Sequence, residues 1–200
     1  MTLLLWLCLL GALLELDTTY AFQLTFSRGI VAGPLLGLLT GDVLTGIQIG
    51  LFTELLFIDI NPLGGMLPPS ATICCTITLA FCMLEIPVYF AFFFGVIGAI
   101  LFSVCEITLR KRRSDWLVLQ EQQIRAYPPA INSVIVRVLG MSFISNFLFL
   151  LIFSLLFGPA FAKLVPHLPG QLEVAAKFAY MAVPWIGLAT LISAFRLKTR

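Results

Sequence analysis

Four polar side chains stand inside an apolar stretch of the chain between residues 29 and 70, namely Asp42, Gln48, Glu54 and Asp59. Asp42, Gly46, Gly50 and Glu54 follow one another at intervals of four residues, so they lie along one ridge of a helix. Carboxylates and amides bind sugar hydroxyls well, and carboxylates at membrane depth equally suit a pathway for a cation or a proton. The residue types alone leave both kinds of ligand open.

The two carboxylates of this ridge have different surroundings. Glu54 lies between apolar residues, with no cation near it in sequence. A carboxylate at such a place is costly unless it is protonated, solvated in a cavity or paired. We therefore favour a functional role for Glu54 over a structural hydrogen bond to a neighbouring helix. Asp42 follows Gly41 at a turn, and we expect its side chain to cap a helix that begins at Val43. Capping is favoured for Asp42, which also stays a candidate for ligand binding.

The segment from residue 61 to residue 70 adds a second polar element. Its three prolines exclude a continuous helix, and its two adjacent glycines permit backbone conformations that are closed to other residues. Backbone groups freed in this way become available to a ligand. The segment reads equally well as a plain turn or as the tip of a re-entrant hairpin. The candidate substrate-binding residues are Glu54, Asp42, Asn61, Gly64, Gly65 and Ser70.

A ladder of glycines precedes this segment. Gly29, Gly33, Gly37 and Gly41 recur at every fourth residue and leave one helix face bare. Each glycine in a helix interior costs roughly 1 kcal/mol relative to alanine, and a membrane helix recovers that cost by packing closely against a neighbour. The ladder predicts close backbone contact between helices.

The composition is that of an integral membrane protein. Hydrophobic residues make up 60% of the chain and charged residues 11%, with a mean hydropathy of +1.05. We expect an all-α membrane protein of one domain over residues 1–200, with room for about six or seven crossings if loops are short. The stretches 26–39 and 43–60 are too short or too polar for simple crossings. Broken or re-entrant helical hairpins account for them better.

Clusters of basic residues predict the topology. Arg110–Arg113 follow the apolar run 88–109, and Arg196, Lys198 and Arg200 follow the run 174–195. Both clusters should be cytoplasmic, and crossings at 131–161 and 174–195 connect them. The chain then divides into N-terminal segments (1–109), a cytoplasmic linker (110–129) with a short surface helix, and C-terminal helices (130–200). The C-terminus is predicted to be cytoplasmic.

The remaining reactive residues point to no catalysis. The five cysteines lie in apolar surroundings and are interpreted as small buried residues, and the single histidine, His167, falls in a loop on the non-cytoplasmic side. No phosphate-binding glycine-lysine loop, metal-spaced set or nucleophile elbow occurs. No cofactor, metal or nucleic acid is expected. The run 1–14 has no basic start, so we interpret it as a short membrane segment and not as a cleaved signal peptide.

One family matches the order of these motifs. The motifs are Ser27–Asp42 with its Gly-Asp turn, the Thr-Gly-x-x-x-Gly step Thr45–Gly50, Thr53–Leu55 and the Gly/Pro segment Gly64–Pro69. In them the chain resembles the IIC subunit of the mannose/fructose/sorbose family of sugar phosphotransferase systems. The detailed resemblance covers residues 15–80, and the remainder follows in hydropathy.

The resemblance implies a permease subunit of a bacterial inner membrane that works in an oligomeric complex. It would pair with a IID-type membrane subunit and bind a hexose near mid-membrane. A cytoplasmic IIB (or IIAB) phosphoprotein, which carries the phosphohistidine, would phosphorylate the sugar. By match to the motif, Glu54 would accept a hydrogen bond from a sugar hydroxyl, and the hairpin from Gly64 to Ser70 would contribute to the site.

Two departures from the family pattern leave other functions open. Ser70 stands where family members usually have an aspartate, and family members are usually longer at the C-terminus. One alternative is a structural or regulatory membrane subunit that has lost transport. The other is an ion- or proton-coupled carrier that uses Asp42, Glu54 and Asp59.

Overall fold

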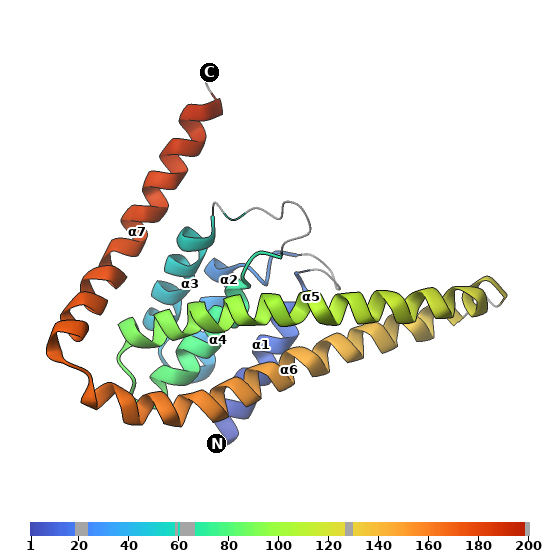
Figure 1. Cartoon of the computed structure of the whole chain (residues 1–200), viewed down its shortest axis with the longest axis horizontal. Helices are drawn as coiled ribbons and strands as arrows, with labels where there is room; N and C mark the ends of the chain where they lie inside the picture. The colour runs from blue at the N-terminus through green and yellow to red at the C-terminus, as the bar shows by residue number, and fades with distance from the viewer. Residues whose placement is uncertain (19–23, 59, 61–66, 127–129, 199–200) are drawn as a thin grey trace.

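The fold is given by a computed structural model, which describes residues 1–18, 24–58, 60, 67–126 and 130–198. Four residues singled out above, Asp59, Asn61, Gly64 and Gly65, lie outside the described residues. The described residues form the helices α1 (Thr2–Leu16), α2 (Gly29–Thr40), α3 (Val43–Phe57), α4 (Ala71–Cys82), α5 (Val88–Ala126), α6 (Ala130–Leu164), the 3₁₀ turn η1 (Val165–His167) and α7 (Gly170–Lys198) (Figure 1). The expected all-α membrane fold is confirmed.

The helices fall into a short and a long class. α1 to α4 have 12 to 15 residues each, which gives about 18–23 Å, less than the roughly 30 Å of a bilayer core. Of the described helices, three have spans long and apolar enough to cross a membrane: 88–118, 132–167 and 170–193. The expected surface helix after Arg110 is not a separate element, because α5 runs on through the basic cluster to Ala126.

A tight turn joins α2 to α3 into a hairpin. Gly41 ends α2 with a left-handed φ of 82°, and its N–H donates to the carbonyl oxygen of Gly37. A residue with a side chain adopts that φ at a cost, so the turn requires glycine. Asp42 then caps α3 by accepting a hydrogen bond from the backbone N–H of Thr45 at 3.0 Å. The cap predicted for Asp42 is confirmed.

Glycines of the two helices of this hairpin meet face to face. A methyl group added at Gly33 would lie 2.7 Å from the Cα atom of Gly50, and one added at Gly37 would lie 3.0 Å from the Cα atom of Gly46. Both distances are shorter than ordinary carbon contacts, and the atoms that would be met belong to the backbone. The glycine ladder therefore brings α2 and α3 into direct backbone contact, as its spacing predicts.

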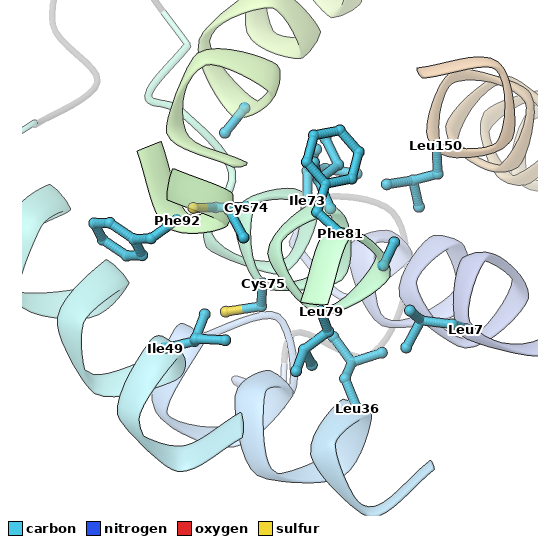
Figure 2. Packing of buried hydrophobic residues seen from close by; sticks show 14 of the residues in the cluster. Leu7, Leu36, Ile49, Ile73, Cys74, Cys75, Leu79, Phe81, Phe92 and Leu150 are labelled. Atoms are coloured by element: carbon cyan, nitrogen blue, oxygen red, sulfur yellow. The ribbon is translucent and has the colours of Figure 1, made fainter. Parts of the chain in front are cut away.

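Helix α4 occupies the centre of the fold. It contacts α1, α2, α3, α5 and α6, and its residues 72–81 are all buried. Figure 2 shows side chains of α4 directed toward different neighbouring helices, with Phe81 and Leu79 among them. Two threonine hydroxyls of α4 are satisfied within the helix: those of Thr76 and Thr78 donate to the carbonyl oxygens four residues earlier at 2.7 Å. The third, that of Thr72, donates to the carbonyl oxygen of Ser27. A polar sequence is thereby made compatible with complete burial.

The long helices α5 and α6 form an antiparallel pair that lies across the short helices (Figure 1). Aromatic rings join the pair to the centre, since the ring of Phe81 in α4 lies about 6 Å from those of Phe94, Phe153 and Phe161.

The cysteines are free thiols; Cys8, Cys74 and Cys75 are buried as expected, whereas Cys105 is exposed on α5.

Helix α7 leaves this pair at an angle (Figure 1). Near its middle, the buried ring of Tyr180 packs against those of Phe52 in α3 and Phe92 in α5. At its start, Glu173 accepts hydrogen bonds from the Tyr89 hydroxyl at 2.9 Å and from Lys177 at 2.8 Å. Further along, Gly187 packs against Leu55 of α3, so closely that a methyl group there would lie 2.8 Å from the Leu55 carbonyl oxygen. The contact of Gly187 with Leu55 lies one residue from Glu54.

Candidate functional site

A pocket of about 550 Å³ opens where four short helices meet the side of α5. Its walls come from the end of α1, the start of α2, the end of α3, the start of α4 and the residues 102–110 of α5. The polar and charged residues among its lining are Glu15, Asp17, Thr18, Thr25, Ser27, Arg28, Glu54, Ser70, Ser103, Glu106 and Arg110. Apolar surface is supplied by Phe57, Ile58, Phe102 and the prolines 68 and 69.

Glu54 is held in this pocket by two donors from the start of α2. The Arg28 guanidinium donates from Nη1 to Oε1 of Glu54 at 2.9 Å, and the backbone N–H of Gly29 donates to Oε2 at 2.9 Å. The side chain of Arg28 is 66% exposed and that of Glu54 24% exposed. The positive end of α2 adds to the electrostatic attraction that Arg28 exerts on this carboxylate. A cation that is distant in sequence thus supplies the charge that the surroundings of Glu54 lack.

A second carboxylate, Glu15, lies in the pocket wall at the end of α1. It is 8% exposed, and its Oε2 accepts a hydrogen bond from the Ser70 hydroxyl at 2.5 Å. Ser70 also caps α4, since its hydroxyl oxygen accepts from the backbone N–H of Ile73 at 3.2 Å. Burial raises the pKa of Glu15 to about 7, against the lowering effect of the bond from Ser70. Glu15 was not among the residues predicted for the site.

Asp17 holds residues that directly precede Arg28. Its carboxylate accepts from the backbone N–H of Leu24 at 2.8 Å and from that of Ser27 at 3.4 Å. The carbonyl oxygen of Ser27 in turn accepts from the Thr72 hydroxyl of α4 at 2.8 Å. These bonds tie the start of α2 to α1 and to α4. The backbone from which the Arg28 side chain extends is therefore held in place.

The wall formed by α5 carries a buried ion-pair network. Glu106, which is 5% exposed, accepts from Arg110 Nε at 3.0 Å and from Arg113 Nη2 at 2.6 Å. Arg113 also donates to the Ser142 hydroxyl of α6. The basic cluster that the sequence suggested only as a topology signal therefore begins inside the pocket and joins α5 to α6.

The structure brings together some of the predicted site residues and separates others. Glu54 and Ser70 both line the pocket. Asp42 lies at the other end of the α2–α3 hairpin, because Gly29 packs beside Glu54 whereas Gly37 packs beside Asp42. There Asp42 is exposed, and its hydrogen bonds with the side chain and backbone of Thr45 lower its pKa. The placement of Asn61, Gly64 and Gly65 lies outside the described residues.

The chemistry of the pocket suits a neutral polar ligand. Two carboxylates and a serine hydroxyl provide directional hydrogen-bonding groups, and ring and proline surfaces provide apolar contact, as in sites for small polar molecules. Within the described ranges, no group of three His, Cys, Asp or Glu side chains could hold a metal ion. Four of the five helices that wall the pocket are too short to cross a bilayer, and many transporters form a substrate site from such interrupted helices.

The fold and the pocket define a helical membrane protein with a polar pocket among short helices. A family model described as the sorbose-specific IIC component of the phosphotransferase system matches residues 1–199. The chain belongs to this family of phosphotransferase-system IIC components. Both the resemblance noted in the sequence and the membrane class expected from composition are thereby confirmed.

Two further similarities agree with this assignment. The chain is 43% identical over 54 residues to the putative N-acetylgalactosamine permease IIC component 2 of Escherichia coli (strain K12). That match covers 27% of this chain and 41% of the relative. A solved structure described as that of a membrane protein superposes with a TM-score of 0.80 at 19% identity, over 98% of this chain and 80% of the other. The latter similarity supports the fold alone.

Proposed function

We propose that this chain is the membrane permease (IIC) subunit of a phosphoenolpyruvate-dependent sugar phosphotransferase system and carries a hexose or a related sugar. The observation that carries the proposal is the placement of the Glu54 carboxylate, which Arg28 and Gly29 hold by hydrogen bonds in the wall of a pocket. A sugar hydroxyl donates well to such a carboxylate, because hydrogen bonds to a charged group are stronger than neutral ones. Phe57 and Phe102 offer apolar faces to the sugar ring.

The position of the basic cluster supports access to the pocket from the cytoplasm. Arg110 lines the pocket and begins the run Arg110–Arg113, which the positive-inside bias assigns to the cytoplasmic side. A sugar in the pocket would then meet a phosphorylated IIB protein at that side. The sugar hydroxyl oxygen attacks phosphorus, the bond from phosphorus to the histidine nitrogen of IIB breaks, and that histidine takes up the hydroxyl proton. The charged product cannot return through the membrane. This chain contributes the site and no phosphorylated residue.

The proposal includes partners and a location. We expect a IID-type membrane subunit beside this chain, a IIB (or IIAB) phosphoprotein in the cytoplasm, and an oligomeric complex in the inner membrane of a bacterium. The C-terminus of α7 would be cytoplasmic. Copurification of the tagged chain with a IID-type protein supports this assembly, whereas purification without such a partner favours a structural or regulatory subunit that does not transport.

Uptake of labelled sugars by cells that hold the whole system tests the function. The panel is sorbose, N-acetylgalactosamine, mannose and fructose, and the variant is Glu54→Gln, which keeps the shape and removes the charge. We expect uptake to fall at least about tenfold, since a hydrogen bond to a charged group is worth about 1.5–3 kcal/mol. Asp115→Asn, at an exposed carboxylate of α5, is the matched control. Unchanged uptake in Glu54→Gln cells would remove Glu54 from the site.

A coupled carrier makes a different prediction in the same cells. The structure places Asp42 and Glu54 at opposite ends of a hairpin, which does not favour a proton path through both carboxylates. If an uncoupler abolishes uptake while phosphoenolpyruvate and the phosphoproteins are present, the carrier alternative is correct. Accumulation of sugar phosphate that survives the uncoupler supports group translocation.

A further inference from the structure

Four carboxylates line the pocket; three of them belong to three different helices, and two of these three have arginine partners. Glu54 of α3 is bonded to Arg28, and Glu106 of α5 is bonded to Arg110 and Arg113. Glu15 of α1 is bonded to a hydroxyl, that of Ser70. A buried carboxylate is costly even when it is hydrogen-bonded, and a neutral partner compensates less than a cation does. An apolar residue at position 15 would be better for stability, so stability does not explain the presence of Glu15.

The Ser70 hydroxyl does not need Glu15 to do its structural work. It already satisfies the start of α4 by accepting from the backbone N–H of Ile73 at 3.2 Å. Its proton is then available for donation, and it is given to Glu15 at 2.5 Å. A carboxylate offers about four acceptor positions, of which Ser70 uses one. This geometry orients the Glu15 carboxylate in the wall while it leaves acceptor capacity for a ligand.

We propose that Glu15, oriented by Ser70, is a second sugar-binding residue of this pocket, which accepts a hydrogen bond from a different hydroxyl than the one bound by Glu54. The inference rests on the proposed function and assigns one further residue to its site. In this arrangement Arg28 holds one carboxylate on α3 and Ser70 holds the other on α1. The separation of the two carboxylates then determines which sugars can donate a hydrogen bond to both. Glu15 is the binding residue and Ser70 is a positioning residue.

The charges around Glu15 make its binding sensitive to pH. Asp17 on the same segment, Arg28 and Glu54 from the hairpin, and Glu106 and Arg110 from α5 line the same pocket. Burial raises the pKa of Glu15 to about 7, Glu106 raises it further and Arg110 lowers it. The ionised acceptor is therefore gained as the pH rises through about 7. Sugar affinity should be higher at pH 8 than at pH 6, and Glu15→Gln should remove the part of this difference that Glu15 causes.

The experiment measures KM and maximal rate for uptake of labelled N-acetylgalactosamine, sorbose, mannose and fructose by cells with the whole system. For the sugar that the unaltered protein takes up, we expect Glu15→Gln to raise KM about tenfold or more, as for the loss of one charge-assisted hydrogen bond. Ser70→Ala should raise KM less, since it disturbs the orientation and keeps the carboxylate. Glu85→Gln, at an exposed carboxylate in the turn between α4 and α5, is the control and should leave KM unchanged.

A pair of variants separates binding from folding. Ser70→Asp places two carboxylates within hydrogen-bond distance, so uptake should survive at pH 6, where they share a proton, and fail at pH 8. The double variant Glu15→Gln with Ser70→Asp keeps one carboxylate at the site and should restore uptake at pH 8.

If Glu15→Gln leaves KM unchanged while Glu54→Gln raises it, Glu15 is not a binding residue and the proposed function stands. If the unaltered protein takes up none of the four sugars, both proposals are overturned.

Discussion

The contact between α2 and α3 makes a quantitative prediction for Gly33→Ala. The new methyl group would lie 2.7 Å from the Cα atom and 3.0 Å from the N atom of Gly50, whereas ordinary contacts begin at 3.4 Å. Both atoms belong to the backbone, so the helices have to separate. Overpacking costs about 1–3 kcal/mol, and alanine returns roughly 1 kcal/mol of helix propensity. With the packing cost in the upper half of its range, we expect a net loss of about 1–2 kcal/mol.

Gly140→Ala is the matched control, because it makes the same chemical change inside α6. A methyl group there meets no atom within 4 Å, so only the propensity term acts, and the variant should be up to about 1 kcal/mol more stable. Thermal unfolding of the detergent-solubilised protein measures both. For a chain of this size the loss at Gly33 corresponds to a lowering of Tm by about 2–8 °C. Equal Tm shifts in the two variants would refute the direct backbone contact.

Two further changes separate local stability from function. Asp42→Ala should lower stability by about 0.5–2 kcal/mol through loss of the cap on α3 and leave the KM for sugar unchanged, as Asp42 lies outside the pocket; a raised KM in a correctly folded variant would return Asp42 to the site. Arg28→Gln should reduce sugar uptake because it releases Glu54, and Arg28→Lys should recover part of it by restoring the charge without the same geometry. Equal sugar uptake in the Arg28→Gln and Arg28→Lys variants would show that the charge of Arg28 is not needed.

Local patterns in the sequence predicted the hairpin correctly. The glycine spacing, the turn at Gly41 and the cap at Asp42 depend on residues at most four positions apart, and such arrangements are set by helix geometry. The long apolar runs predicted the spans of α5, α6 and α7 for the same reason. The continuation of α5 through Arg110–Arg113 was not foreseen, since the change of composition there suggested a linker, whereas Glu106 pairs with the basic residues and lets the helix continue.

The composition of the pocket required the tertiary structure. Arg28 and Glu54 are separated by 26 residues, and Glu15 and Ser70 by 55, so neither pair has a signature in sequence. The spacing of Asp42 and Glu54 along one helix ridge does not bring their side chains together, because the two residues lie near opposite ends of α3. Twelve residues along a helix span about 18 Å. Glu15 could have been suspected only as an acidic residue at the end of an apolar run.

The sequence also suggested that Ser70 removes a charged acceptor from the pattern of the family. In the structure the Ser70 hydroxyl is bonded to a carboxylate from another helix, so negative charge remains available at the same corner of the pocket. A substitution that looks like a loss in one segment can be accompanied by a group from a distant segment. Side-chain contacts across helices decide such cases, and a single sequence does not contain them.

The central position of α4 has a consequence for biogenesis. A helix of 12 residues is about 18 Å long, so it cannot serve the insertion machinery as a crossing of its own. Its neighbours include α5 and α6, which are synthesised later. When α4 leaves the ribosome, two of the five helices that it contacts do not yet exist. The short helices therefore reach their final burial only after α5 and α6 have inserted, and a chain truncated before α6 should be a substrate for membrane proteases.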